Sequence, residues 1–374
     1  MRSVRITRRR CGARDESDFN DPANSSAASA RLAGVIAVTL ASASLSISGV
    51  THADGVEGLK AQGMFCSATA QALFRACGNQ VDDDYWVSFG ICINESDDAD
   101  RAECFADAKS ARGEGRQLCR EQLAGRRDTC GLVGEGRYDP EFEPASFDAN
   151  FANLSNPNRY FPLGIGNQWE FRSSTQSTKV EVLKETKLID EVRCIVVRDE
   201  VKEDGDLIES TNDWYAQAKD GNVWYCGEET RSFESFDGDR PRKPELVSID
   251  GSFKAGRDGD KPGIIFRASP FAGEAYVEES SLGNAEDATV VLSTSYAYGK
   301  SPVLDQLVPR KLAQLLCNGD CIVTRNFSLL EPGVFERKYY APGIGVFLEI
   351  EPKSGEVVQL IKCNVDPRCA ALPH

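Results

Sequence analysis

This chain has almost no histidine, so little of it can use imidazole for catalysis or metal binding. Of its 374 residues only two are histidines: His52 falls in a segment that we assign to a leader, and His374 is the last residue. The rest of the chain therefore offers no histidine for a Ser-His-Asp or Cys-His catalytic unit, or for a zinc site. Any acid–base chemistry would fall to carboxylates, lysines, tyrosines or cysteines.

Carboxylates are the most abundant of these groups. Paired Asp and Glu side chains across a cleft can hydrolyse glycosidic bonds, which gives one alternative function, a carboxylate-based hydrolase acting on envelope polymer. Solvated strand faces are the simpler interpretation of the same residues, and we prefer it. The candidates are Asp199, Glu200, Asp213, Glu228, Glu229, Glu278 and Glu279.

Three Asp-Gly-Asp triplets, at 204–206, 237–239 and 258–260, raise the question of calcium. None has the spacing or the closing glutamate of a helix-loop-helix calcium loop. Asp and Gly are also the residues that tight turns prefer, so the triplets predict turns. We expect no metal and no cofactor, with calcium-stabilised packing as a remaining alternative.

Aromatic residues give the leading site prediction. Tryptophan and tyrosine recur in the second part of the chain, where they could line a cavity for an apolar or sugar ligand. In an antiparallel meander most such residues form core and cross-strand pairs, but a curved sheet can keep a ligand-sized interior. The predicted ligand-binding residues are Trp169, Trp214, Tyr215, Trp224 and Tyr339.

Six cysteines in the first part of the chain are separated by 11, 15, 12, 15 and 11 residues, the same in either direction. Eleven residues make about three helical turns, so Cys119, Leu123, Arg126 and Cys130 form one stripe. A helical hairpin that turns near 94–100 explains this symmetry, with glycines at 78–79 and 113–115 expected to break its arms. The predicted nested bridges are Cys66–Cys130, Cys77–Cys119 and Cys92–Cys104.

Six further cysteines lie in the second part. Cys317 and Cys321 flank a turn, as do Cys363 and Cys369, so we expect two local bridges. Cys194 and Cys226 are either paired or buried as free thiols. A redox pair at Cys317 and Cys321 is the alternative, but the sequence lacks the strand-to-helix setting of oxidoreductases. For the six cysteines of the first part the rival interpretation is a metal cluster, but tight Cys-x-x-Cys pairs and a nearby histidine are absent from the sequence there.

Changes in composition divide the chain into five segments. A weakly apolar run is followed by small residues at Thr51 and Ala53, which predicts signal-peptide cleavage after Ala53. The predicted segments are a leader at 1–53, a Cys-rich helical domain at 54–130, a linker at 131–161, an antiparallel β domain at 162–362 and a C-terminal tail at 363–374.

Strand periodicity begins near Pro162 and is interrupted by hairpin signals such as Asp204-Gly205 and Asp220-Gly221. No alternation of helices and strands suggests a parallel sheet. The predicted fold class is α+β: a disulfide-braced helical hairpin followed by an antiparallel β meander, curved into a barrel or half-barrel that protects its edges.

Charge and cysteine content indicate the compartment. The formal net charge is −15, and the leader carries seven basic and four acidic residues, so the remainder is near −18. Such a surface repels phosphate backbones and anionic lipid, and we expect no nucleic-acid partner and no stable membrane span after leader removal. Twelve cysteines beyond the leader suit an oxidising compartment. We expect an exported protein, periplasmic or secreted.

Several segments resemble a set of exported bacterial β proteins with a lipoprotein-like half-barrel. The run Phe161-Pro162-Leu163-Gly164-Ile165-Gly166-Asn167-Gln168-Trp169 is similar to their first strand, and Tyr339-Tyr340-Ala341-Pro342-Gly343-Ile344-Gly345-Val346 to their closing hairpin. Residues 213–217, 221–225 and 130–140 resemble a subgroup with a Cys-rich helical N-terminal segment. The resemblance covers roughly residues 120–350. It implies a half-barrel wall covered inside by a helix or loop, with no catalytic role.

Together these patterns predict an exported, non-enzymatic binding or structural module of the cell envelope or secreted milieu. It would hold a small amphiphilic ligand or a protein partner, neither of which the sequence identifies. The carboxylate-based hydrolase is the alternative.

Overall fold

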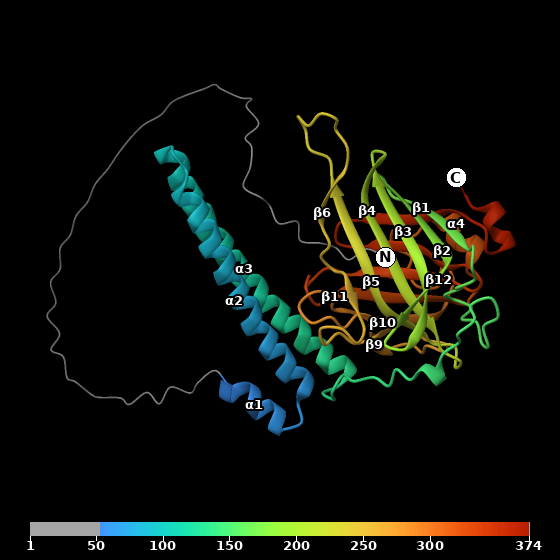
Figure 1. The fold of residues 1–374 in the computed structure, drawn as a ribbon. Coiled ribbons are helices and arrows are strands. Elements are labelled where there is room, and N and C mark those ends of the chain that lie inside the picture. The colour runs from blue at the N-terminus through green and yellow to red at the C-terminus, as the bar shows by residue number, and fades with distance from the viewer. Residues whose placement is uncertain (1–52, 374) are drawn as a thin grey trace.

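The computed structural model describes residues 53–373. The predicted leader, together with His52 and His374, lies outside these residues. Within them, a long helical hairpin projects from a β domain (Figure 1). The helices are α1 (Ala53–Ala61), α2 (Phe65–Ile93), α3 (Asp98–Val133) and α4 (Arg310–Leu316), with short 3₁₀ turns at Pro144–Ser146 and Pro367–Ala371. No helix of this part of the chain is both long and apolar enough to cross a membrane.

Three disulfides hold α2 and α3 side by side along their length. They join Cys66 to Cys130, Cys77 to Cys119 and Cys92 to Cys104, which is the nested arrangement expected from the symmetric spacing. The turn falls at 94–97, where the Asp97 side chain accepts hydrogen bonds from the backbone of Ala99 and Asp100 and so caps α3.

The expected helix breaks at 78–79 and 113–115 are wrong, because both helices run through these glycines. Gly115 has a packing role instead. A Cβ atom added there would lie 2.9 Å from a Val81 methyl group on the other arm. Gly78 has open space around it. Cross-linking and interhelical contact therefore outweigh the low helix propensity of glycine.

Fourteen antiparallel strands in the described residues form one sheet, in the order β6-β5-β4-β3-β2-β1-β14-β13-β12-β11-β10-β9, with β7 and β8 also paired to β5. The first strands are β1 (Gln168–Arg172), β2 (Gln176–Ile189), β3 (Val192–Glu203), β4 (Asp206–Gln217) and β5 (Val223–Glu234). Short strands follow: β6 (Glu245–Ser248), β7 (Phe253–Lys254), β8 (Gly263–Phe266) and β9 (Ala275–Val277). The last are β10 (Asp287–Tyr296), β11 (Cys321–Ser328), β12 (Glu336–Ala341), β13 (Gly345–Glu351) and β14 (Glu356–Cys363).

Tight turns set the register of the long hairpins. Asp204 and Gly205 both have positive φ angles, +50° and +91°, as a two-residue turn between β3 and β4 requires. Asp190 and Glu191 adopt the same left-handed backbone between β2 and β3. The first Asp-Gly-Asp triplet is thus part of a turn, as its composition predicted.

The sheet does not close into a barrel, so the barrel alternative of the fold prediction is wrong. Its path ends at β6 on one side and at β9 on the other. These edges are protected without closure: α3 contacts β9, and Pro244 directly precedes β6, with Pro241 three residues earlier. Prolines and covering elements are common ways of blunting an exposed edge.

The two halves of the sheet nevertheless face each other. Figure 1 shows β2–β5 crossing over β10–β12, and one hydrophobic cluster draws side chains from both halves. Phe266 of β8 packs on Tyr340 of β12, with ring centroids 4.6 Å apart, and the indole of Trp169 donates to the carbonyl of Ile344 at 2.8 Å. The core therefore lies inside the curve of the sheet.

A second, smaller cluster lies on the other face of β3–β5. Cys194 and Cys226 are both fully buried there and form a disulfide. The segment at 131–161 packs against this face, since Phe147 is buried and pairs with Ala218. The segment is thus bound to the domain.

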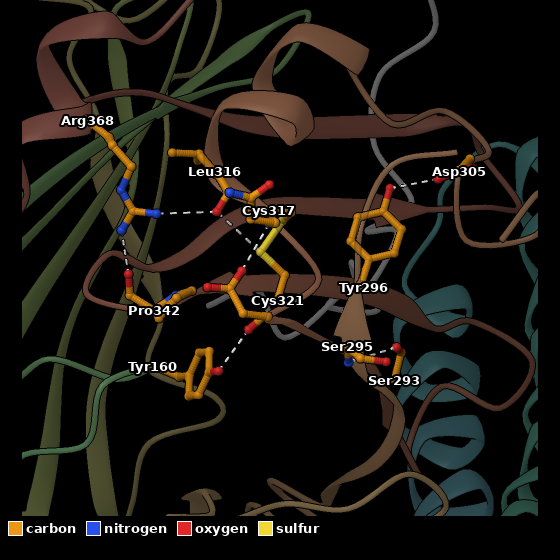
Figure 2. Close-up of a disulfide and its surroundings, with 12 residues drawn as sticks. Tyr160, Ser293, Ser295, Tyr296, Asp305, Leu316, Cys317, Cys321, Pro342 and Arg368 are labelled. Carbon is orange, nitrogen blue, oxygen red and sulfur yellow. Dashed lines mark hydrogen bonds between the residues drawn. A yellow bond between two sulfur atoms is a disulfide. The ribbon is translucent and has the colours of Figure 1, made fainter. Parts of the chain in front are cut away.

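Local bridges tie down the C-terminal region, as expected: Cys317–Cys321 and Cys363–Cys369. Figure 2 shows the first, where the Arg368 guanidinium donates to the carbonyls of Leu316 and Pro342. The described chain thus contains six disulfides, which favours an oxidising, extracytoplasmic environment.

Candidate functional site

A groove of about 850 Å³ lies between the base of the helical hairpin and the sheet. This volume falls within the range of roughly 300–1,000 Å³ that small-molecule sites occupy. Its apolar walls come from α2 on one side and from β8 and β9 on the other. They include Ala68, Ala70, Leu73, Ile264, Tyr276 and Val277. We call this site the hairpin groove.

The start of α2 is held in place by the residues that follow α3. Gly134 has a φ of +93°, which turns the chain back after Val133. The Glu135 carboxylate then accepts hydrogen bonds from the backbone and the hydroxyl of Ser67, at 2.9 and 2.5 Å. These bonds lower the pKa of Glu135, and its negative charge suits the helix N-terminus. The helical wall of the groove is therefore fixed at the start of α2.

A buried ion pair fastens the hairpin to the sheet. Arg126 of α3 donates through Nε and Nη2 to the two carboxylate oxygens of Glu286, each at 2.8 Å, and both side chains are about 5% exposed. The backbone of Gly283 also donates to Glu286, at 2.6 Å. The Gln122 side chain donates to the carbonyl of Leu330 at 2.9 Å, one helical turn earlier. A two-bond guanidinium–carboxylate contact fixes orientation as well as distance.

One nitrogen of this arginine is not satisfied by the described protein atoms. Arg126 lines the hairpin groove, and its Nη1 is buried without a hydrogen-bond partner among residues 53–373. Leaving a buried donor unpaired costs roughly 1–3 kcal/mol, and more for a charged group. An acceptor that reaches this nitrogen from the groove would remove that cost.

Other charged groups along the groove favour an electron-rich ligand. The Arg137 guanidinium lies 3.9 Å from the centre of the Phe65 ring. Arg267 also lines the groove, with Nε 3.3 Å from Glu274. Burial raises the pKa of Asp287 to about 7 and, with Asp287 nearby, raises that of Glu279 well above its usual range. A raised pKa makes these carboxyls lose their protons less readily, which reduces the negative charge that would repel an anion.

A second, smaller hollow of about 100 Å³ lies inside the curve of the sheet, and we call it the interior cavity. Trp169 and Tyr215 line it together with Asp199 and Asp213. The Tyr225 hydroxyl donates to Asp213 at 2.5 Å, but burial dominates and raises the pKa of Asp213 to about 7.

The interpretation of the acidic residues as solvated strand faces is wrong for three of them. Asp199, Asp213 and Glu278 are at most 5% exposed. Glu278 accepts hydrogen bonds from the Thr289 hydroxyl at 2.5 Å and the Asn326 amide at 2.8 Å, while burial raises its pKa. The inward side of the sheet is therefore partly polar, which alternation of apolar and charged residues along a strand does not reveal.

The five predicted ligand-binding aromatics are divided among separate places. Trp169 and Tyr215 line the interior cavity, and Trp224 lines the hairpin groove. Trp214 is buried in the second cluster, with Lys187 Nζ 3.6 Å from its ring centre. Tyr339 is fully buried in the main core, where its hydroxyl donates to the carbonyl of Leu304 at 2.6 Å. A shared aromatic site is not formed.

The groove residues Arg126, Glu286, Arg137 and Arg267 were not among the sequence-based site predictions. One signal was present for Arg126: it stands in the inward stripe between Cys119 and Cys130, where a charge is out of place. Its partner Glu286 is 160 residues away and carries no comparable signal.

No protein-family model, curated protein or solved structure matches this chain. The resemblance to exported half-barrel proteins therefore stays a prediction, and function has to be argued from geometry.

Proposed function

We propose that this protein is an exported, non-enzymatic binding protein that holds an amphiphile with an oxyanion head in the hairpin groove. The observation that carries the proposal is the buried, unpartnered Nη1 of Arg126 in a groove of ligand size. In this proposal the curved sheet acts as a half-barrel wall and the hairpin covers one end of it.

The apolar walls support an alkyl or acyl portion of the ligand. Small side chains on α2, such as Ala68 and Ala70, leave space opposite Tyr276 and Val277 of β9. Burial of each methylene group contributes about 0.8 kcal/mol, so a chain of ten carbons along these walls contributes about 8 kcal/mol before the cost of association is subtracted.

The donors support an oxyanion as the head. Arg126 uses two nitrogens on Glu286, so the pair is neutral as a unit but still has Nη1 to offer. Arg137 adds positive charge at the same groove. A carboxylate or a phosphate monoester meets these donors equally well, because both present several acceptor oxygens.

The test uses purified, delipidated protein lacking residues 1–53, with dodecanoate and dodecyl phosphate as probes in titration calorimetry. Dodecyltrimethylammonium serves as the tail-matched cation. We expect both anions to bind and the cation to bind at least tenfold more weakly. Equal affinity for anion and cation would refute the role of the arginines.

Two substitutions on α2 separate the groove from the rest of the surface. Ala72 lines the groove and Ala76, about one helical turn later, does not, although both are exposed. Ala72→Trp is expected to weaken dodecanoate binding at least tenfold, whereas Ala76→Trp leaves it unchanged. Arg126→Lys keeps the charge opposite Glu286 but loses the forked donor, and we expect about tenfold weaker binding for the anions alone.

One observation speaks for the alternative hydrolase. Asp199 and Asp213 line the same interior cavity, and the pKa of Asp213 is raised to about 7, as a general acid needs. The cavity, however, has a volume of about 100 Å³, well below the space that a polymer segment requires. The geometry favours binding over hydrolysis.

A further inference from the structure

The far end of the helical hairpin carries an apolar surface that residues 53–373 leave uncovered. Four large side chains near the end of α2 are between 58% and 66% exposed: Trp86, Val87, Ile91 and Ile93. We call them the tip surface. Leu73 is the last residue of α2 that lines the hairpin groove, and at 1.5 Å per residue the 20 positions from there to Ile93 span about 30 Å. Figure 1 shows the tip standing clear of the β domain.

These four side chains lie on one side of the helix. At 100° per residue they occupy an arc of about 160°, while Cys92 lies opposite and is bonded to Cys104 of α3. The tip surface is thus the outer face of α2, turned away from its partner helix. Contiguous exposed apolar side chains of this size, with a tryptophan among them, are typical of a binding surface.

The tip is also rigid, which lowers the entropic cost of binding. The Cys92–Cys104 bridge closes the end of the hairpin. Behind the tip surface, the Phe89 and Phe105 rings pack with centroids 4.7 Å apart, and the Arg112 guanidinium lies 4.4 Å from the centre of the Tyr85 ring.

Charge identifies the kind of occupant. Arg112 and Arg116 of α3 pair with Asp82, so the far half of the hairpin is counted from Asp82 to Arg116. This stretch has ten acidic and four basic residues, a formal charge of −6. Anionic lipid and a second copy of the same tip would both be repelled. A positively charged partner would be attracted and steered toward the surface.

We propose that the tip surface docks a basic protein partner, one that presents an apolar groove or helix face ringed by lysine and arginine. Trp86 inserts into the apolar part of the partner, and the acidic residues near the tip attract the partner's basic residues and orient it. This inference does not depend on the ligand of the hairpin groove.

The probe is a synthetic amphipathic helix of leucine and lysine, titrated into the protein lacking residues 1–53 while tryptophan emission is recorded. Trp86 is exposed, whereas Trp169 and Trp214 are at most 8% exposed. The half-buried Trp224 lines the hairpin groove, so the titration uses a Trp224→Phe background, in which a blue shift reports burial at the tip. We expect a saturable blue shift that weakens at least tenfold between low salt and 0.5 M NaCl. A leucine–glutamate helix and anionic phosphatidylglycerol vesicles should give none.

Matched variants complete the test, with affinity measured by anisotropy of labelled peptide. Ile91→Ser removes part of the tip surface, and Val303→Ser changes a residue of similar exposure, 68%, on the β domain. We expect at least fivefold weaker binding for Ile91→Ser and no change for Val303→Ser. Asp83→Asn combined with Asp84→Asn should reduce the salt dependence.

Three results would overturn the proposal: peptide binding without a Trp86 shift, equal affinity of the Ile91→Ser and Val303→Ser variants, or a comparable shift with anionic vesicles. Concentration-dependent self-association through the tip would likewise refute it, because the proposal assigns the surface to a cationic partner.

Discussion

Asp213 offers the sharpest test of the polar interior. It is 3% exposed, and burial raises its pKa from 3.8 to about 7. Between those pH values the folded protein keeps a proton that the unfolded chain has lost. Since the folded state then binds more protons, the free energy of unfolding falls as pH rises from about 4 to about 7 and is level above that.

The size of the effect follows from the shift. About three pKa units at about 1.4 kcal/mol each amount to about 4 kcal/mol of stability lost across this pH window. Asp213→Asn removes the ionisable group but keeps an oxygen that can accept a hydrogen bond from the Tyr225 hydroxyl. In the wild type this hydroxyl lies 2.5 Å from Oδ1 of Asp213. The variant should therefore match the wild type near pH 4 and exceed its stability by up to about 4 kcal/mol at pH 8.

Urea unfolding followed by tryptophan fluorescence at pH 4.5, 6 and 8 measures the difference. Asp287 and Glu331, whose pKa values burial also raises to about 7, add slopes of the same sign in both proteins. The charge of Asp213 contributes to the raised pKa of Glu279, so both proteins carry Glu279→Gln and the comparison then isolates Asp213. Asp204→Asn, in the exposed turn between β3 and β4, is the matched control and should leave the pH profile unchanged. An Asp213→Asn profile parallel to that of the wild type would refute the reasoning.

Two further predictions concern glycines and disulfides. Gly78→Ala should raise the free energy of unfolding by about 0.5–1 kcal/mol, because alanine has the higher helix propensity and the added methyl group meets open space. Gly115→Ala should lower the free energy of unfolding, because its new methyl group lies 2.9 Å from a methyl group of Val81. Thermal melts of the two variants measure both effects. Replacing Cys194–Cys226 with serines should cost about 4 kcal/mol, against about 2 kcal/mol for Cys317–Cys321, since the bridged residues are 32 and 4 positions apart. Equal urea midpoints for the two disulfide variants would contradict the loop-length argument.

The sequence predicted the elements whose signals are local. The symmetric cysteine spacing gave the hairpin and its three bridges, and the Asp-Gly turns located β3–β5. The short strands β8 and β9 were not predicted, because segments of four and three residues are too short to show a strand periodicity. Whether the sheet closes into a barrel depends on whether its two edge strands, β6 and β9, pair with each other. These strands are distant in sequence, and no local pattern predicts whether they pair.

The candidate groove was harder to predict than the fold because its parts are distant in sequence. Arg126 and Glu286 are 160 residues apart and meet only when the hairpin docks on the sheet. The buried carboxyls were misread for a related reason. Asp213 and Glu278 lie on or beside strands where charge normally marks the solvent face, and only the curvature of the sheet turns them inward.

The hairpin groove and the tip surface lie at opposite ends of the same helical hairpin. Its base forms one wall of the groove, fixed by Arg126 on Glu286, and its tip carries the exposed apolar face. Three disulfides between these ends make α2 and α3 a single stiff arm, so the tip cannot collapse onto the sheet to bury its own tryptophan. The three bridges therefore keep the tip surface exposed to solvent. Burying its apolar side chains would increase the stability of the fold, so their exposure is better explained by binding of a partner.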